Sequence, residues 1–362
     1  MKKSIISLAI AAGLIASMSA QAASDVKVKW FGFAQLTAEA GDGADLSAKR
    51  VDGSGNPDGG LVFGADRVRF GFKIKDGNVF GKLQADLNRK HENSAKTGTL
   101  PEIIKDIEAG YKFSNAASLK VGQFKTPLGM DFNTSGKKLD ITKRGMEKGL
   151  VLERTAGIML SGRKIANGFG YDLFFGNVSG RGAASATKNG ALSGKDNTTV
   201  ARVMYDMGKM MHVELGYGIE DNSSTAANAD DYTVMDLGLR VKMAAMTIKA
   251  EYIDGQSVAG VKNQDETAWY GHFGYNLDKT TELLVRHYQA DADAPGGGST
   301  SLTNTYLGAN FFLGSNRTNG RVQLNYVIAG GDTFTTTGTN YAGQAAKGYT
   351  DDTFLAQYQI SF

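Results

Sequence analysis

Apolar and polar residues alternate with a period of two over almost the whole chain, from Val26 to Phe362. Residues 67–75, RVRFGFKIK, show this most clearly. An extended chain places their valine, phenylalanines and isoleucine on one side, and their arginines and lysines on the other. A helix would scatter the same charges around its surface. The pattern therefore predicts β-strands throughout the chain.

The alternation predicts sixteen strands. They lie near residues 26–38, 66–75, 78–88, 102–113, 117–124, 151–163, 168–176, 198–207, 210–220, 230–243, 245–254, 265–277, 280–289, 302–313, 320–329 and 350–362. Short connections, mostly of Asn, Asp and Gly typical of hairpin turns, alternate with long, polar connections. All 4 prolines fall in the long connections, which fits a fully paired sheet because proline cannot donate to its ladder.

An even number of strands, with long connections at one end and short turns at the other, is typical of a transmembrane β-barrel. Barrel closure leaves no unpaired backbone edge in hydrocarbon. We therefore expect an all-β fold: a 16-stranded antiparallel transmembrane β-barrel with long outer loops, short periplasmic turns and a lipid-facing apolar surface. The alternative, a soluble sandwich or lipocalin-like barrel, would bury inward charges such as Arg67, Asp86 and Glu214 in a dry core, which is costly.

The first 22 residues are predicted to be a cleaved signal peptide. Lys2 and Lys3 precede an apolar run too short to span a membrane, and residues 20–22 form an A-x-A cleavage site. Residues 23–362 would then form a single barrel domain. The formal net charge of +3 loses two lysines with the signal, so overall charge indicates no partner.

Residues 125–150 interrupt the strand pattern with a basic insert. We expect this third long connection to fold inward and narrow the bore, which makes it a constriction loop. Its candidate constriction residues are Lys137, Lys138, Lys143, Arg144 and Lys148. Alternatively, these residues could lie on the cell surface and contact lipopolysaccharide phosphates.

Basic residues also recur on the predicted inward face. They are Arg67, Arg69, Lys73, Lys75, Lys82, Lys120, Arg163, Arg202, Arg240, Lys242 and Arg321. Rings of lysine and arginine favour anions in a pore. Inward acids such as Asp86, Asp106 and Glu108 leave a wall of mixed charge as the alternative.

Motifs of catalysis are absent from the sequence. The 4 histidines are scattered without an H-E-x-x-H pair, and no G-x-S-x-G elbow occurs. The sequence contains no cysteine, which excludes disulfides and thiolate metal sites. We therefore expect a protein that is not an enzyme, has no metal or cofactor, and binds no nucleic acid.

Residues 121–129, VGQFKTPLG, followed by residues 152–154 and Arg163, resemble the phosphate-selective porin family (porins O and P). The resemblance implies a trimeric, sixteen-stranded porin whose third loop folds into the lumen. It also implies that lumen arginines and constriction lysines select anions. By position, Lys125 matches the lysine of the motif and Arg154 matches the strand that re-enters the barrel, so both join the predicted pore-lining set.

These patterns favour a passive-diffusion porin of a Gram-negative outer membrane, with a preference for anions such as phosphate. The expected partners are the lipid bilayer, lipopolysaccharide, small anions and two further copies of the chain. The aromatic residue Phe362 resembles the C-terminal signature read by the outer-membrane assembly machinery. The alternatives are a general or cation-preferring porin, and a structural or adhesive surface protein.

Overall fold

The computed structural model describes residues 26–41, 60–88, 103–179, 196–293, 297–331, 348–349 and 351–362. The predicted signal peptide, residues 1–22, lies outside these ranges. The strands are β1 (Lys27–Gly41), β2 (Gly60–Asp76), β3 (Val79–Asp86), β4 (Ile104–Lys112), β5 (Ser118–Lys125), β6 (Arg154–Ile165), β7 (Phe169–Asn177), β8 (Asn197–Met207), β9 (Met211–Glu220), β10 (Tyr232–Met243), β11 (Met246–Gln256), β12 (Glu266–Asn276), β13 (Thr281–Asp293), β14 (Ser299–Phe312), β15 (Gly320–Gly331) and β16 (Thr353–Ser361). The helices are short: α2 (Met130–Asn133), η1 (Gly136–Lys138), η2 (Met146–Gly149), η3 (Ala166–Gly168) and η4 (Val258–Gly260).

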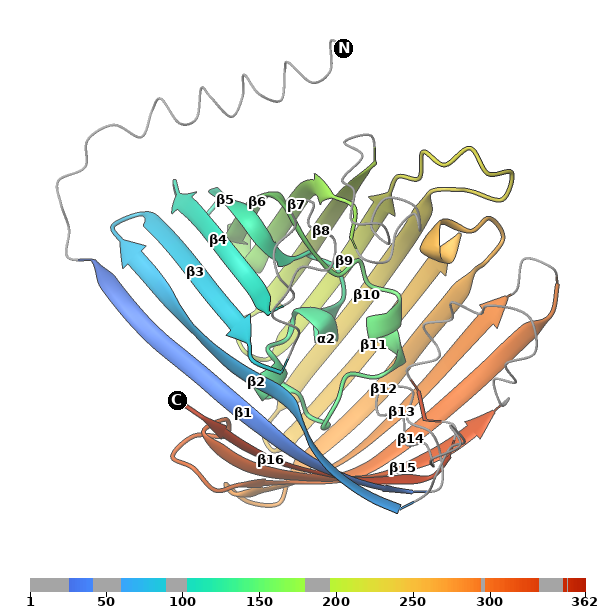
Figure 1. Cartoon of the computed structure of the whole chain (residues 1–362). Coiled ribbons are helices and arrows are strands. Elements are labelled where there is room, and N and C mark those ends of the chain that lie inside the picture. The colour runs from blue at the N-terminus through green and yellow to red at the C-terminus, as the bar shows by residue number, and fades with distance from the viewer. Residues whose placement is uncertain are drawn as a thin grey trace, which may run out of the picture.

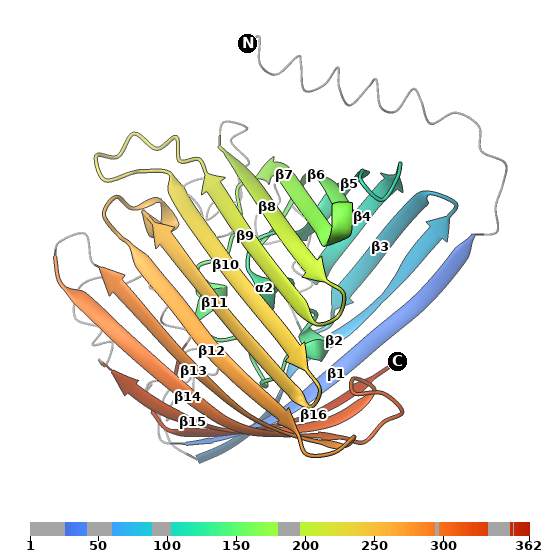
Figure 2. The same cartoon turned by 180° about the vertical axis from the view of Figure 1, so that it is seen from behind.

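The sixteen strands form one closed barrel in which each strand pairs with its neighbours in sequence (Figures 1 and 2). Every pairing is antiparallel. The seam joins the first and last strands, from Phe33 opposite Ser361 to Gly41 opposite Thr353. The predicted fold class and the existence of all sixteen strands are confirmed.

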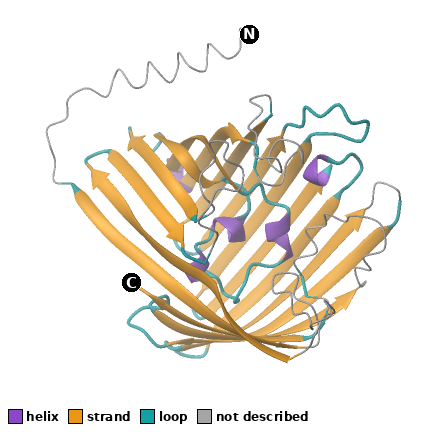
Figure 3. Cartoon of the chain, in the orientation of Figure 1, coloured by secondary structure: helices purple, strands orange, loops and turns teal. Residues whose placement is uncertain are grey.

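The helical pieces are few and short (Figure 3). Within the described ranges, no helix has the length and apolar character needed to cross a membrane. Alternation along each strand sorts the side chains between the two faces of the barrel. Large apolar residues such as Trp30, Phe70 and Leu215 are exposed on the outside, while Gln35, Asp86 and Gln359 are buried on the inside.

Most strand boundaries differ from the prediction by one to four residues, and the largest difference is at the start of β2. β2 begins at Gly60, six residues early, because residues 60–65 continue the pairing with β1 beyond a bulge opposite Gln35 and Leu36. The extra residue of a bulge breaks the period-two pattern that sequence analysis follows. β6 begins only at Arg154. Val151 and Leu152, predicted to be in this strand, are instead buried against the barrel interior.

The connection from β5 to β6, residues 126–153, enters the barrel and is called the inward loop below. It contains α2, η1 and η2, which lie inside the ring of strands in Figures 1 and 3. Leu128, Met146 and Leu150 are fully buried and pack into one apolar cluster with inward residues of the wall, among them Leu302 and Tyr306. Part of the inner face of the barrel is therefore apolar, because the apolar side of the loop needs an apolar wall.

Candidate functional site

Polar side chains of the wall hold the backbone of the inward loop. Side chains of β1, β14, β15 and β16 donate hydrogen bonds to backbone carbonyl oxygens of the loop. These bonds run from Gln35 to Gly136 O (3.1 Å), Asn310 to Asp140 O (2.9 Å), Arg321 to Leu139 O (2.9 Å), Gln323 to Asp140 O (2.9 Å) and Gln359 to Lys137 O (3.2 Å). Backbone groups that leave the strand ladders are thereby paired inside the barrel. The loop consequently follows the inner wall and does not float in the lumen.

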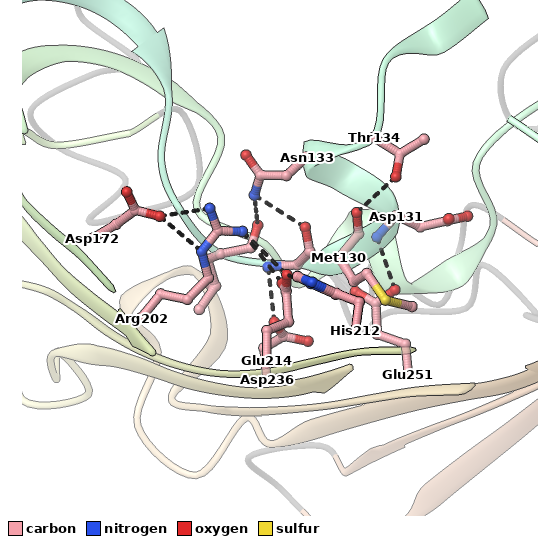
Figure 4. A network of polar contacts seen from close by, with 12 residues as sticks. Met130, Asp131, Asn133, Thr134, Asp172, Arg202, His212, Glu214, Asp236 and Glu251 are labelled. Atoms are coloured by element: carbon pink, nitrogen blue, oxygen red, sulfur yellow. Dashed lines mark hydrogen bonds and ion pairs between the residues drawn. The ribbon is translucent and has the colours of Figure 1, made fainter. Parts of the chain in front are cut away.

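The first turn of the loop is held by acidic residues of β10 and β11 (Figure 4). The backbone N–H of Gly129 donates to Asp236 Oδ2 at 3.1 Å, and that of Asp131 donates to Glu251 Oε2 at 3.0 Å. Gly129 has φ of 82°, a left-handed conformation that favours glycine. The first turn of the loop thus lies against β10 and β11, and open space remains on another side of the loop.

That open space is a cavity of about 490 Å³ between strands β1–β6 and β8 of the wall and the loop segment 133–137. Its lining is strongly basic. The cations are Lys29, Arg69, Lys73, Lys82, Lys120, Lys125, Lys137, Arg154, Arg163 and Arg202, whereas only Asp106 and Glu108 are acidic. Nine of these ten cations were predicted from the sequence as pore-lining or constriction residues, and the structure brings those nine together.

Acidic residues behind or within the lining pair with several of these cations. Lys82 and Arg154 share Asp106, and Lys120 lies 2.7 Å from Glu108 Oε2. Asp172 binds both Arg163 (2.7 Å) and Arg202 (2.6 Å), and Asp86 binds Arg69 (3.0 Å). These ion pairs fix the arginine side chains against the wall.

Lys29, Lys73 and Lys137 differ from the paired cations. Within the described part of the chain they have no ion pair with a carboxylate. Lys73 is directly opposite Lys29 on β1 and Lys82 on β3, an arrangement of like charges that destabilises a sheet. Burial, followed by the charges of Lys138, Lys29 and Lys73, lowers the pKa of Lys137. The cavity therefore has a positive potential that local carboxylates do not cancel.

Other predicted pore-lining residues lie away from this cavity. Arg67 is buried beside Gln35, to which it donates at 2.8 Å, and Arg321 is buried behind the inward loop. Arg240 and Lys242 are on β10, which contributes no residue to the cavity lining. Lys75 lines a separate recess of about 320 Å³ beside the β2–β3 and β4–β5 turns.

Among the predicted constriction residues, only Lys137 lines the cavity. Lys143 pairs with Glu39, and Lys148 lies 3.1 Å from Glu153 Oε1. Arg144 donates to the carbonyl oxygens of Asp131 (2.9 Å) and Thr134, and Lys138 is exposed. These positions inside the barrel disagree with the alternative that the insert lies on the cell surface.

Sequence analysis did not identify Lys29, Lys249 and Arg286. Lys29 could have been found, because it alternates with the outward Val28 and Trp30. Lys249 and Arg286 bind carboxylates of the inward loop. Their partners lie more than a hundred residues away in sequence, so no local pattern indicates them.

Glu147 of η2 provides a prediction about pH. It is fully buried, and neither of its carboxyl oxygens has a hydrogen-bond partner in the described part of the chain. The groups around it are Asp131 of α2, Glu251 of β11, Arg286 and Tyr288 of β13, and Arg144 of the same loop. Burial, followed by the charge of Asp131, raises the pKa of Glu147 from 4.5 to about 7.

A docked loop therefore binds more protons than a displaced loop between pH 4.5 and 7. Docking is then strongest in acid and weakens as the pH rises through this window, with the full loss reached above 7. We expect larger fluctuations of single-channel current at pH 8 than at pH 5, and a Glu147→Gln variant that stays quiet at both. An unchanged pH dependence in this variant would contradict the role of Glu147.

Comparison with known proteins gives the following matches. The family model for phosphate-selective porin O and P matches residues 44–279. No curated protein matches the chain. Among solved structures, OmpT of Vibrio cholerae in its trimer form has a TM-score of 0.61 at 14% identity, covering 94% of this chain and 100% of that one. An anion-selective porin from Comamonas acidovorans has a TM-score of 0.63 at 11% sequence identity, covering 93% of this chain and 100% of that one. The outer membrane channel DcaP of Acinetobacter baumannii has a TM-score of 0.65 at 13% sequence identity, covering 93% of this chain and 97% of that one.

Proposed function

Since the chain belongs to the phosphate-selective porin O and P family, and is thus an outer-membrane porin of a Gram-negative cell, we propose that it conducts small anions by passive diffusion through the basic cavity. A closed barrel provides the path across the membrane. The inward loop narrows this path on one side. No chemical step is required, since solutes move down their own gradients.

The observation that carries this proposal is the composition of the cavity lining, with ten cations against two carboxylates. Basic rings favour anions in a pore, whereas acidic rings favour cations. An oxyanion such as phosphate would receive charge-assisted hydrogen bonds from arginines and point charges from lysines. Lys29, Lys73 and Lys137, which lack a carboxylate partner in the described residues, are the candidates for direct contact.

Conduction also requires that binding be weak or divided among several positions. The cavity meets this condition because most of its arginines are already engaged by Asp86, Asp106 and Asp172. A passing anion would meet lysines on β1, β2 and the inward loop in turn. Its binding energy would thus be spread along the path, so that no single deep site holds it.

Recording in a planar bilayer under a salt gradient tests the proposal directly. We expect stepwise conductance and a reversal potential of the sign given by anion preference. A reversal potential near zero would favour a general porin, and the opposite sign a cation-preferring one. Complete absence of conductance from correctly folded protein would favour a structural or adhesive role.

Inorganic phosphate should compete with chloride for the cavity. We expect added phosphate to reduce the chloride current in a concentration-dependent way, since a multiply charged oxyanion interacts more strongly with the lysines. Measurement of chloride conductance against phosphate concentration gives the apparent affinity. An equal current at all phosphate concentrations would show that the pathway conducts anions without preferring phosphate.

We extend the proposal to a homotrimer embedded in lipid and lipopolysaccharide. The family resemblance supports a trimer, and OmpT of Vibrio cholerae, which shares the fold, has a structure in trimer form. A single barrel must still conduct on its own, because each barrel contains its own cavity. Native gel electrophoresis in mild detergent, with chemical crosslinking, would give the number of copies.

A further inference from the structure

Arg286 of β13 is the largest of the fully buried side chains in the described part of the chain, with 0% exposure. Its guanidinium group reaches into the inward loop. Nη1 donates to Asp131 Oδ2 at 2.7 Å, and Nη2 donates to Asp140 Oδ2 at 3.0 Å. One arginine thus binds two loop carboxylates that are nine residues apart in sequence.

The wall keeps this guanidinium in one orientation. Nη1 also donates to Tyr288 Oη at 2.9 Å, and Nε lies 3.3 Å from His272 Nδ1. The ring of Tyr270 lies beneath the guanidinium, 4.4 Å from its central carbon. A planar group held by hydrogen bonds at its edges and by an aromatic face has little freedom to rotate. Arg286 is therefore oriented for its loop partners by residues of β12 and β13.

The two carboxylates flank the part of the loop that matters for conduction. Asp131 precedes, and Asp140 follows, the segment 133–137 that lines the basic cavity. Lys249 of β11 pairs with Asp140 as well, and its Nζ lies 3.8 Å from Asp131 Oδ1. The cavity-lining segment is consequently held at both ends by buried charges from β11 and β13.

We propose that Arg286 is a positioning residue that sets the width of the pore by binding Asp131 and Asp140. Arg286 contacts no solute itself; it acts through the inward loop. When Arg286 is lost, two acidic groups remain near Lys249 alone, and the segment between them is free to move into the cavity or away from the wall. The inference rests on the proposed function only in taking the inward loop as the boundary of the conducting path.

The test compares Arg286→Gln with the parent in two measurements. The first is single-channel conductance and its noise, which we expect to change by about twofold when the loop boundary shifts. The second is independent of conduction and uses the absence of cysteine from the chain. Ala268, buried in the apolar cluster under the loop, is replaced by cysteine, and its reaction with a charged thiol reagent is followed.

We expect the thiol at position 268 to react slowly in the Ala268→Cys protein and about tenfold faster when Arg286→Gln is added, because local opening exposes it. Neutralising one acid, as Asp131→Asn with Arg286→Gln, leaves Asp140 paired with Lys249 and should restore conductance and thiol protection toward parent values. A residue with only a general structural role would not be rescued in this way. Arg317→Gln, which removes an exposed arginine at a turn, is the matched control.

Folding is checked first by the shift in gel mobility on heating. Should Arg286→Gln not be recovered folded, Arg286→Lys carries the test, because lysine keeps the charge but cannot bind both carboxylates in fork geometry. Folded variants with parent conductance and parent thiol reactivity would overturn the inference. Thiol exposure in a protein that never conducts would instead support the positioning role and count against the proposed function.

Discussion

Replacement of Lys29, Lys73 and Lys137 together by glutamine is expected to move the reversal potential strongly toward cation preference. These three lysines line the cavity and form no ion pair in the described part of the chain. A lysine about 4 Å from a passing anion contributes ~1 kcal/mol even in water-like surroundings. A free-energy difference of ~1.4 kcal/mol corresponds to a tenfold change in an equilibrium constant. The triple variant should therefore lower the ratio of anion to cation permeability by about tenfold or more.

The measurement is the reversal potential in a potassium chloride gradient at low ionic strength, since screening shortens the reach of each charge to about 10 Å at 0.1 M salt. The matched control is Lys75→Gln, Arg240→Gln and Lys242→Gln, which removes the same formal charge from positions outside the cavity. A similar shift in both triple variants would mean that net charge, and not the cavity, sets selectivity.

The second large effect is expected from Gly145→Val in the inward loop. Gly145 lies against the ring of Tyr288, and a Cβ at this position would overlap the ring. Overpacking of this kind costs about 1–3 kcal/mol, and the loop yields more readily than the barrel wall. We expect displacement of the loop, a conductance change of roughly twofold since the open cross-section changes, and weaker anion preference.

Gly271→Ala on β12 is the control for this prediction, because a Cβ there would meet nothing within 4 Å. It should leave conductance and selectivity at parent values. If Gly145→Val instead gives parent conductance together with a folded barrel, the inward loop does not limit the path. Tyr288 also accepts a hydrogen bond from Arg286, so Gly145→Val tests the loop at a contact next to the Arg286 anchor.

The strands could be predicted from the sequence because their signal is local. Alternation along residues 67–75 places four cations on one face without knowledge of any partner. What these cations do depends on distant residues. Arg67 lies beside Gln35 under the inward loop, and Arg69 binds Asp86, so only Lys73 and Lys75 of this run remain without a carboxylate partner in the described part. The pattern gave the correct face, but it could not distinguish paired from unpaired charges.

The inward loop shows the opposite limit. Its lysines were the reason to expect a constriction, yet Lys143 and Lys148 are paired with Glu39 and Glu153. The apolar residues of the inward loop attach it to the wall. They follow no periodic pattern in the sequence, so the sequence does not reveal which wall residues they contact. The partners of Arg286 cannot be predicted for the same reason, because its acceptors lie about 150 residues earlier and reach it only when the loop folds into the barrel.

The apolar cluster under the inward loop affects which lumen positions can tolerate substitution during evolution. Inward positions of β13 and β14, such as Ala290 and Leu302, are surrounded by apolar side chains, as in the interior of a water-soluble protein. A substitution that introduces a charge there would destabilise the barrel and be selected against. The lysines of β2 and β3 that line the basic cavity, Lys73 and Lys82, face open space, and such positions can exchange one polar residue for another at small cost. Tolerance to substitution should therefore vary around the circumference, with one half of the lumen surface slow to change and the other half free to adapt to a new solute.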